Sequence, residues 1–169
     1  MALLTTDLCD AYAEDPEAHL RVVNPMFVGY GGRCRFSGPV TTLKLFEDNA
    51  QVRAVLSEPS RGGVLVVDGG GSMRCALLGD RLAALGRDNG WSGVLIYGCV
   101  RDSAELARID FGVQALNTHP LKSHKAGHGE RDVSVTFAGA TIKPGDWLCA
   151  DEDGVIVAER ALTLAAGGA

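Results

Sequence analysis

The sequence lacks the features that mark several large protein classes. Its 169 residues contain no C-x-x-C pair, and the five cysteines are scattered singly along the chain. An odd number of unclustered cysteines argues against a disulfide framework and against a structural zinc site, and favours buried free thiols in a reducing compartment. No apolar run approaches the roughly 18 residues that span a bilayer. Disulfide-stapled, zinc-finger and membrane-spanning architectures are therefore not expected.

The chain also lacks a concentration of positive charge. Its net charge is -5, and the basic residues are spread along the sequence. The electrostatic pattern of a nucleic-acid-binding protein is therefore absent. The first fifteen residues, MALLTTDLCDAYAED, carry acidic side chains where a secretory signal peptide carries basic ones. We expect a cytoplasmic protein that contacts neither a membrane nor nucleic acid directly.

Several well-known site motifs are missing as well. The glycines at 69–71 are followed by Arg74, which does not fit G-x-G-x-x-G, and there is no Walker lysine. His119, His124 and His128 do not have the spacing of H-E-x-x-H. The histidine-containing segment is expected to be a solvated, glycine-hinged loop that serves as a lid or a subunit contact. No Ser, His and Asp order typical of a hydrolase is apparent.

Apolar runs that alternate with helical patterns are what the sequence does contain. The runs VLVVD, GVLIY and FGVQALNT predict buried strands, and the segments between them, GDRLAALGRDNG and SAELARID, predict helices. This order implies a parallel β-α-β-α-β unit, preceded by another helix in EDNAQVRAVLSE. We expect a single α/β domain over residues 1–169, with a frayed tail at 165–169.

Other segments predict the elements around this unit. RCRFSGPVTTLKLF predicts two strands joined by a turn at Gly38-Pro39, and the last third of the chain predicts antiparallel strands. Helices are predicted at about 5–14, opened by Thr5 or Thr6, and at 158–166.

Charged residues stand where the strand GVLIYGCV ends. Arg101 and Asp102 follow it directly, and the helix that begins GDRL starts near the same edge of the sheet, where ligands of α/β proteins bind. A helix start preceded by glycine offers N–H groups to an anion, but Asp80 could equally be an ordinary helix cap. Arg101 and Asp102 could be a surface ion pair, or the aspartate could hold Mg²⁺ together with waters. The residues alone leave these alternatives open.

The segment from Phe46 to Leu116 resembles the regulator of ribonuclease activity A (RraA-like) family, whose members include 4-hydroxy-4-methyl-2-oxoglutarate aldolases. The family pattern of a glycine, about twenty residues and then R-D-x-x-E/D is matched by Gly79, Arg101, Asp102 and Glu105. The resemblance continues through GERDVSVTFAGATIKPGDWLCADEDGVIV, so that it covers nearly the whole chain.

The resemblance implies a three-layer β/β/α swivelling-domain fold, assembled as a homotrimer with active sites near the subunit interfaces. It implies a divalent-metal-dependent aldolase that cleaves 4-hydroxy-4-methyl-2-oxoglutarate to two pyruvates and also decarboxylates oxaloacetate. Both reactions pass through a pyruvate enolate, which a metal and an arginine can stabilise. No lysine stands at a recognisable Schiff-base position, which favours the metal-dependent route.

The resemblance also implies roles for individual residues. The substrate carboxylate would be bound at the helix start by Gly79, Asp80, Arg81 and Leu82. Arg101 would contact the substrate and the developing enolate oxygen, Asp102 would bind Mg²⁺ or Mn²⁺, and Glu105 would orient a water or support the site.

The family name implies an alternative role, a non-catalytic regulator that binds and inhibits an endoribonuclease of the RNase E type. An inhibitor needs a surface rather than a metal ligand, so the complete R-D-x-x-E set favours the enzyme. Some similar chains are named as menaquinone methyltransferases, but no glycine-rich cofactor loop supports that activity in this sequence.

Overall fold

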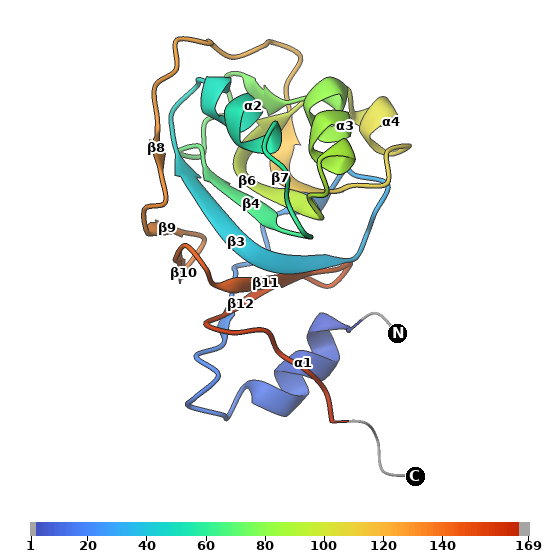
Figure 1. The fold of residues 1–169 in the computed structure, drawn as a ribbon, viewed down its shortest axis with the longest axis vertical. Coiled ribbons are helices and arrows are strands. Elements are labelled where there is room, and N and C mark those ends of the chain that lie inside the picture. Colours follow the sequence, from blue (N-terminus) through green and yellow to red (C-terminus); the bar gives the residue numbers. More distant parts are fainter. Residues whose placement is uncertain (1–2, 166–169) are drawn as a thin grey trace.

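A sheet of ten strands forms the frame of the molecule. The computed structural model describes residues 3–165 of the chain (Figure 1). The helices are α1 (Thr5–Tyr12), α2 (Ala50–Leu56), α3 (Asp80–Asp88) and α4 (Ser103–Leu106). The strands are β1 (Arg21–Val22), β2 (Val28–Gly29), β3 (Phe36–Lys44), β4 (Val64–Asp68), β5 (Ala76–Leu78), β6 (Gly93–Val100), β7 (Gly112–Thr118), β8 (Glu130–Arg131), β9 (Val135–Phe137), β10 (Ala140–Ile142), β11 (Trp147–Ala150) and β12 (Val155–Ala158). Within this part of the chain, no helix has both the length and the apolar character needed to cross a membrane.

Four parallel strands form the centre of the sheet, in the order β3-β4-β6-β7. Helix α2 follows β3, α3 lies between β4 and β6, and α4 connects β6 to β7. This confirms the predicted β-α-β-α-β unit and adds β3 to it. The short strand β5 has no counterpart among the predicted elements. It pairs in parallel with the carboxyl end of β6, and it leads directly into α3.

The central strands are covered on both faces. In β4, Leu65 and Val67 pack in the cluster that contains the helices α2 and α3, whereas Val64 and Val66 pack with residues of β9 to β12. Successive residues of a strand face opposite sides, so a continuous apolar run is what two covered faces require. Figure 1 shows α2, α3 and α4 on one side of the central strands and β9 to β12 on the other. The predicted three-layer β/β/α fold is therefore confirmed.

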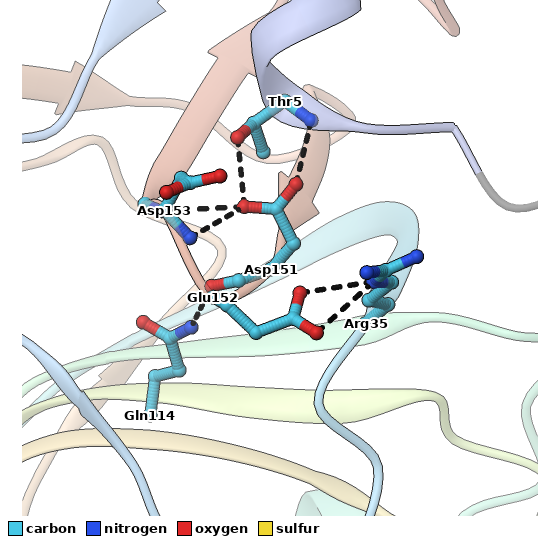
Figure 2. A network of polar contacts seen from close by, with 7 residues as sticks. Thr5, Arg35, Gln114, Asp151, Glu152 and Asp153 are labelled. Carbon is cyan, nitrogen blue, oxygen red and sulfur yellow. Dashed lines mark hydrogen bonds and ion pairs between the residues drawn. The ribbon is translucent and has the colours of Figure 1, made fainter.

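Helix α1 is attached outside these layers, against β11 and β12. Its first helical residue is Thr5, and the preceding Leu4 provides no side-chain cap. The cap comes from the turn between β11 and β12 instead, where the buried Asp151 accepts hydrogen bonds from the Thr5 N–H at 2.6 Å and from its hydroxyl at 2.7 Å (Figure 2). The same carboxylate also accepts from the N–H groups of Asp153 and Gly154. One aspartate thus joins the N-terminal helix to the sheet.

The predicted turn at Gly38-Pro39 is wrong, because β3 runs through both residues as one strand. Gly38 and Pro39 pair with β11, and from Val40 onward the strand pairs with β4. A side chain on Gly38 would overlap the carbonyl oxygen of Gly62. The glycine therefore permits a close backbone approach, and Pro39 stands where the strand changes its partner.

The helix predicted at 158–166 is also wrong for the described residues. Ala158 ends β12, and the chain continues without helical structure through residue 165. Leu162 is buried in a cluster with Leu8 of α1, and the Tyr12 hydroxyl donates to the Thr163 carbonyl. A helix this short is marginal without tertiary support, so these contacts decide the path of the segment. Residue 166 and the predicted frayed tail, apart from Ala165, lie outside the described residues.

Candidate functional site

A pocket of about 630 Å³ lies where β5 ends, α3 begins and β6 runs into α4. Six of the residues expected to form the site line this pocket, namely Gly79, Asp80, Arg81, Leu82, Arg101 and Asp102. Their convergence follows from the topology. Because β5 and β6 are parallel neighbours, the residues after each strand emerge at the same edge of the sheet.

Asp102 holds its place through an unusual backbone conformation. Its φ is 58° and its ψ is 42°, the left-handed region, where aspartate and asparagine are among the few side chains that occur with any frequency. The Asp102 carbonyl accepts the N–H of Leu106 at 2.8 Å, which begins α4. Its Oδ2 lies 3.3 Å from the N–H nitrogen of Asp80. The aspartate is therefore directed across to the start of α3.

The close approach of Asp102 to α3 depends on Gly79. A Cβ at this position would overlap Oδ2 of Asp102, so no other residue fits without moving the carboxylate. The backbone of Gly79 is extended (φ -131°, ψ -168°), a conformation that any residue adopts. The glycine is thus needed for space and not for its conformational freedom.

The N–H groups at the start of α3 are partly engaged. The N–H of Asp80 points to Asp102, and the N–H of Arg81 donates to the Asp80 carboxylate at 2.8 Å. Asp80 is the first helical residue rather than the cap, which is Gly79. A substrate carboxylate at this helix end would have to displace these carboxylates or use the N–H of Leu82.

Arg101 is fixed at its backbone and open at its side chain. Its N–H donates to the Leu78 carbonyl at 2.9 Å, while its side chain is 41% exposed. The shortest separation between the guanidinium and the Asp102 carboxylate is 4.0 Å, from Nε to Oδ2, the outer limit for an ion pair. A tight surface pair is therefore not formed, and the guanidinium retains donors for a ligand.

Glu105 is not brought together with the other predicted residues. It lies in α4, and its carboxylate is 3.6 Å from the guanidinium of Arg108, one helical turn later. It does not line the pocket. The pattern R-D-x-x-E thus places its arginine and aspartate in the pocket and its glutamate on the outer side of α4.

Three cationic residues of the pocket were not predicted from the sequence. Arg53 comes from α2, and Lys122 and Lys125 come from the histidine-containing loop. Nothing in the local sequence signals these positions, because the loop reaches the pocket through long-range pairing. Lys122 forms a bridge with Ala76 of β5, and His124 forms one with Asp48.

Asp48 fixes the path of the histidine-containing loop. Its side chain is buried, and its Oδ2 accepts the backbone N–H groups of Ala126, Gly127 and His128 at 2.9, 2.9 and 3.2 Å, while Oδ1 accepts the N–H of Ala50 at 3.0 Å. Burial alone raises the pKa of this carboxyl, but the four N–H donors outweigh it and hold the pKa below its ordinary value. The predicted glycine-hinged loop is therefore tied to the start of α2.

A second pocket, of about 430 Å³, lies near β2 and the turn before β12. Its one cation and one of its three carboxylates are already paired. Arg33 contacts Asp110 at 2.9 Å, and Glu152 contacts Arg35 at the same distance. The pocket at the start of α3 is the better candidate site, because its charges are open to a ligand.

The residues at the start of α3 fit a weakly held divalent cation. Mg²⁺ binds hard oxygen ligands, takes only one or two protein carboxylates and keeps several waters. The Asp102 carboxylate is 40% exposed and has only long contacts to Arg101 and Asp80. Within residues 3–165 there is no group of three or more His, Cys, Asp or Glu side chains arranged for a metal. The donor set therefore suits a hydrated ion and not a multi-ligand site.

Comparison with known proteins decides the family. The family described as Aldolase/RraA matches residues 5–157. The chain belongs to the RraA-like family. A relative from Halorhodospira halophila, named as a candidate 4-hydroxy-4-methyl-2-oxoglutarate aldolase, is 80% identical over 164 residues, which are 97% of this chain and 100% of the relative.

Two solved structures of RraA-like proteins are closely similar. The RNA-processing inhibitor RraA from Thermus thermophilis has 45% identity and a TM-score of 0.91, and the match covers 100% of both chains. A protein from Geobacillus kaustophilus, described as S-adenosylmethionine: 2-dimethylmenaquinone methyltransferase, has 48% identity and a TM-score of 0.90, covering 95% of this chain and 97% of its own.

The glycines at 69–71 have packing roles in this RraA-like chain. Gly70 and Gly71 have φ of 67° and 70°, and side chains there would crowd Phe46 and Tyr97. None of the three glycines lines the pocket at the start of α3. The lack of room for side chains at these positions explains the glycines by packing.

Proposed function

We propose that this chain is a divalent-metal-dependent aldolase that cleaves 4-hydroxy-4-methyl-2-oxoglutarate to two molecules of pyruvate. The observation that carries the proposal is the meeting of Arg101, Asp102 and the start of α3 in one pocket. This pocket combines an anion-binding helix end, an open guanidinium and a carboxylate for a cation. The names of the closely related proteins support the same activity.

The reaction breaks the bond between C3 and C4 of the substrate. The C4 hydroxyl loses its proton and becomes the carbonyl of one pyruvate. The electron pair of the broken bond moves to C3 and the C2 carbonyl, which gives a pyruvate enolate. A proton added at C3 then completes the second pyruvate. Negative charge therefore develops on the C2 oxygen, and the site has to stabilise it there.

Arg101 is the residue suited to that charge. Its guanidinium offers several donors in a plane, so it can contact a carboxylate oxygen and the C2 oxygen together. The C1 carboxylate would lie at the start of α3, at the N–H of Leu82 and, once it displaces the Asp80 carboxylate, at the N–H of Arg81. This docking orients the C3–C4 bond before it breaks, which lowers the entropic part of the barrier.

Asp102 would hold the divalent cation, with waters completing its coordination. When bound, the cation supplies Lewis-acid stabilisation of the charge at the C2 oxygen. Gly79 leaves the space that the Asp102 carboxylate needs, and Asp80 provides a second carboxylate at the same pocket. Glu105 has no role in this assignment, because its side chain is directed to Arg108.

Decarboxylation of oxaloacetate would use the same residues. The bond between C3 and C4 breaks again, carbon dioxide leaves in place of a pyruvate, and the remaining electrons form the same enolate. A site built around that enolate should catalyse both reactions.

The direct test is an assay of pyruvate release from both substrates, with and without EDTA. Activity should be lost after chelation and should return with Mg²⁺ or Mn²⁺. Full activity after exhaustive chelation would contradict metal dependence, and no pyruvate from either substrate under any metal would contradict the proposal.

We also propose that the protein is a homotrimer. An assembly of subunits would cover some of the large apolar side chains that the described part of the chain exposes. These side chains are those of Leu3, Val22, Met26, Val28, Phe46, Met73 and Leu121. Light scattering should give three times the mass of one chain, and a stable monomer at micromolar concentration would contradict the assembly.

A second candidate function is the binding and inhibition of an endoribonuclease of the RNase E type. It is favoured by the 45% identity, over the full chain, to a protein described as an RNA-processing inhibitor. The two functions can be separated with Asp102→Asn, which should remove pyruvate release and leave binding to an immobilised RNase E unchanged. Absence of binding by the wild-type protein would reject this second function alone.

A further inference from the structure

The pocket at the start of α3 collects cations that have no carboxylate partner. Of the sixteen lysines and arginines, nine have a carboxylate within 4.0 Å in the described part of the chain, which leaves seven. Four of these seven line this single pocket, namely Arg53, Arg81, Lys122 and Lys125. In a chain of net charge -5, such a concentration of unpaired positive charge indicates an anionic ligand.

The charge of the pocket exceeds what one carboxylate can neutralise. Five cationic side chains line it, with Arg101 as the fifth, and they face only the carboxylates of Asp80 and Asp102. Like charges held together repel each other when no ligand is bound. A ligand with two carboxylates would complement the pocket better than a ligand with one.

The backbone that carries the cations is held firmly. Lys122 forms a bridge with Ala76, whose N–H donates to the Leu121 carbonyl at 2.8 Å. Lys125 lies between His124, which bridges to Asp48, and Ala126, whose N–H donates to the Asp48 carboxylate. The lysines therefore stand at defined positions on the pocket and not on a free loop.

Arg53 belongs to the same arrangement. It lies in the last turn of the short helix α2, and Ala50 at the start of that helix donates its N–H to the other oxygen of Asp48. A single buried carboxylate thus joins the helix that carries Arg53 to the loop that carries both lysines. Because the supporting backbone is ordered before a ligand arrives, little ordering cost remains on binding.

We infer that Arg53, Lys122 and Lys125 form a second anion subsite that binds the carboxylate at the far end of a dicarboxylic 2-oxo acid. The assignment of the near end, at Arg101 and the start of α3, rests on the proposed function. In 4-hydroxy-4-methyl-2-oxoglutarate the far carboxylate is the one attached to C4. The subsite selects dicarboxylic substrates over 2-oxo acids that end in an apolar group.

The test compares two ligands that cannot undergo the aldol cleavage. 2-Oxoglutarate has a far carboxylate and no C4 hydroxyl, and 2-oxopentanoate has the same five-carbon chain with a methyl end. Titration calorimetry with Mg²⁺ present should show that the wild-type protein binds 2-oxoglutarate at least about tenfold more tightly, a difference of roughly 1.4 kcal/mol. The double variant Lys122→Gln/Lys125→Gln should lose this preference and keep its affinity for 2-oxopentanoate.

Lys143→Gln is the matched control. Lys143 is exposed and lies outside the pocket. Its substitution removes one positive charge, as each of the two pocket substitutions does, but it should leave the preference for 2-oxoglutarate intact. Equal binding of the two ligands by the wild-type protein, no binding of 2-oxoglutarate, or a preference that survives the double variant would overturn the inference. A preference that depends on the lysines in a protein that releases no pyruvate would support the subsite and reject the aldolase.

Discussion

Gly79 and Asp102 share a space that holds only one side chain, since a Cβ on the glycine would overlap Oδ2 of the aspartate. Gly79→Ala should therefore displace the Asp102 carboxylate while leaving the extended backbone of residue 79 unstrained. A misplacement of about 1 Å can cost a factor of roughly 10² in rate. We expect kcat/KM for pyruvate release to fall by about that factor, with an unchanged circular dichroism spectrum.

Gly29→Ala is a suitable control for this substitution, because no atom lies within 4 Å of a Cβ at Gly29. It should retain wild-type activity. If Gly79→Ala is as active as the control, the placement of Asp102 does not matter for the reaction.

Asp102→Asn should separate catalysis from folding. Asparagine is among the residues that best tolerate the left-handed conformation found at this position, so the turn into α4 should persist. The loss of the negative charge should lower kcat by about 10²–10³ for aldol cleavage and for oxaloacetate decarboxylation alike. Parallel assays of both substrates measure this, and oxalate should inhibit both reactions of the wild-type protein. A variant that lost only one of the two activities would indicate two sites.

Arg101→Lys should also impair the enzyme, although the charge is kept. An ammonium group cannot reproduce the planar set of donors that a guanidinium presents to a carboxylate and an adjacent oxygen. Because these contacts strengthen as the enolate forms, kcat should fall more than KM rises. Steady-state kinetics would show this division. An unchanged kcat with a raised KM would assign Arg101 to substrate binding alone.

Asp48→Asn should loosen the histidine-containing loop and destabilise the protein. The substitution replaces a carboxylate that accepts four N–H groups, and one hydrogen bond to a charged group is worth about 1.5–3 kcal/mol. We expect a loss of at least about 1.5 kcal/mol in the free energy of unfolding at pH 7, measured by urea denaturation.

The effect of this substitution should depend on pH. The pKa of Asp48 is lowered in the folded protein, so the contribution of its charge is present above the ordinary pKa of about 3.9 and is lost as the pH falls through the lower, folded value. The difference in stability between wild type and Asp48→Asn should therefore narrow below about pH 4. A constant difference from pH 7 to pH 3 would mean that the ionised carboxylate is not what holds the loop.

Thr5→Val should weaken the attachment of α1. The Thr5 hydroxyl donates to Asp151 at 2.7 Å in a buried position, and valine keeps the branched shape without the donor. We expect the free energy of unfolding, measured by thermal or urea denaturation, to fall by about 1.5–3 kcal/mol. Thr6→Val, at an exposed position of the same helix, should have little effect. Equal losses for the two variants would contradict the role of Asp151 as the helix cap.

The parallel centre of the fold was predictable because buried strands read as apolar runs, and VLVVD and GVLIY are unmistakable in the sequence. The continuous path of β3 was not, because Gly38 and Pro39 are typical turn residues and only the approach of Gly62 explains the glycine. Likewise, the C-terminal segment has a helical composition, but the burial of Leu162 against α1 determines its path.

The site shows the same division between local and long-range information. Arg101 and Asp102 follow a strand directly, so their place at the edge of the sheet could be predicted from sequence. The position of Lys122 depends on its pairing with Ala76, and that of Lys125 depends on Asp48; both partners lie far away in the sequence, so neither leaves a local pattern. Glu105 matches the family motif by spacing, yet the geometry of α4 turns it toward Arg108.

The Asp48 carboxylate holds the loop through the backbone N–H groups of residues 126–128 and contacts no side chain of the loop. These contacts therefore do not depend on the side chains at positions 122 and 125. We therefore expect the chain to keep its course beside α2 when lysine is exchanged for an apolar or an acidic residue at 122 or 125. The side of the pocket that carries Lys122 and Lys125 can thus change one residue at a time. Evolution or design could alter the substrate preference there while Arg101 and Asp102 stay in place.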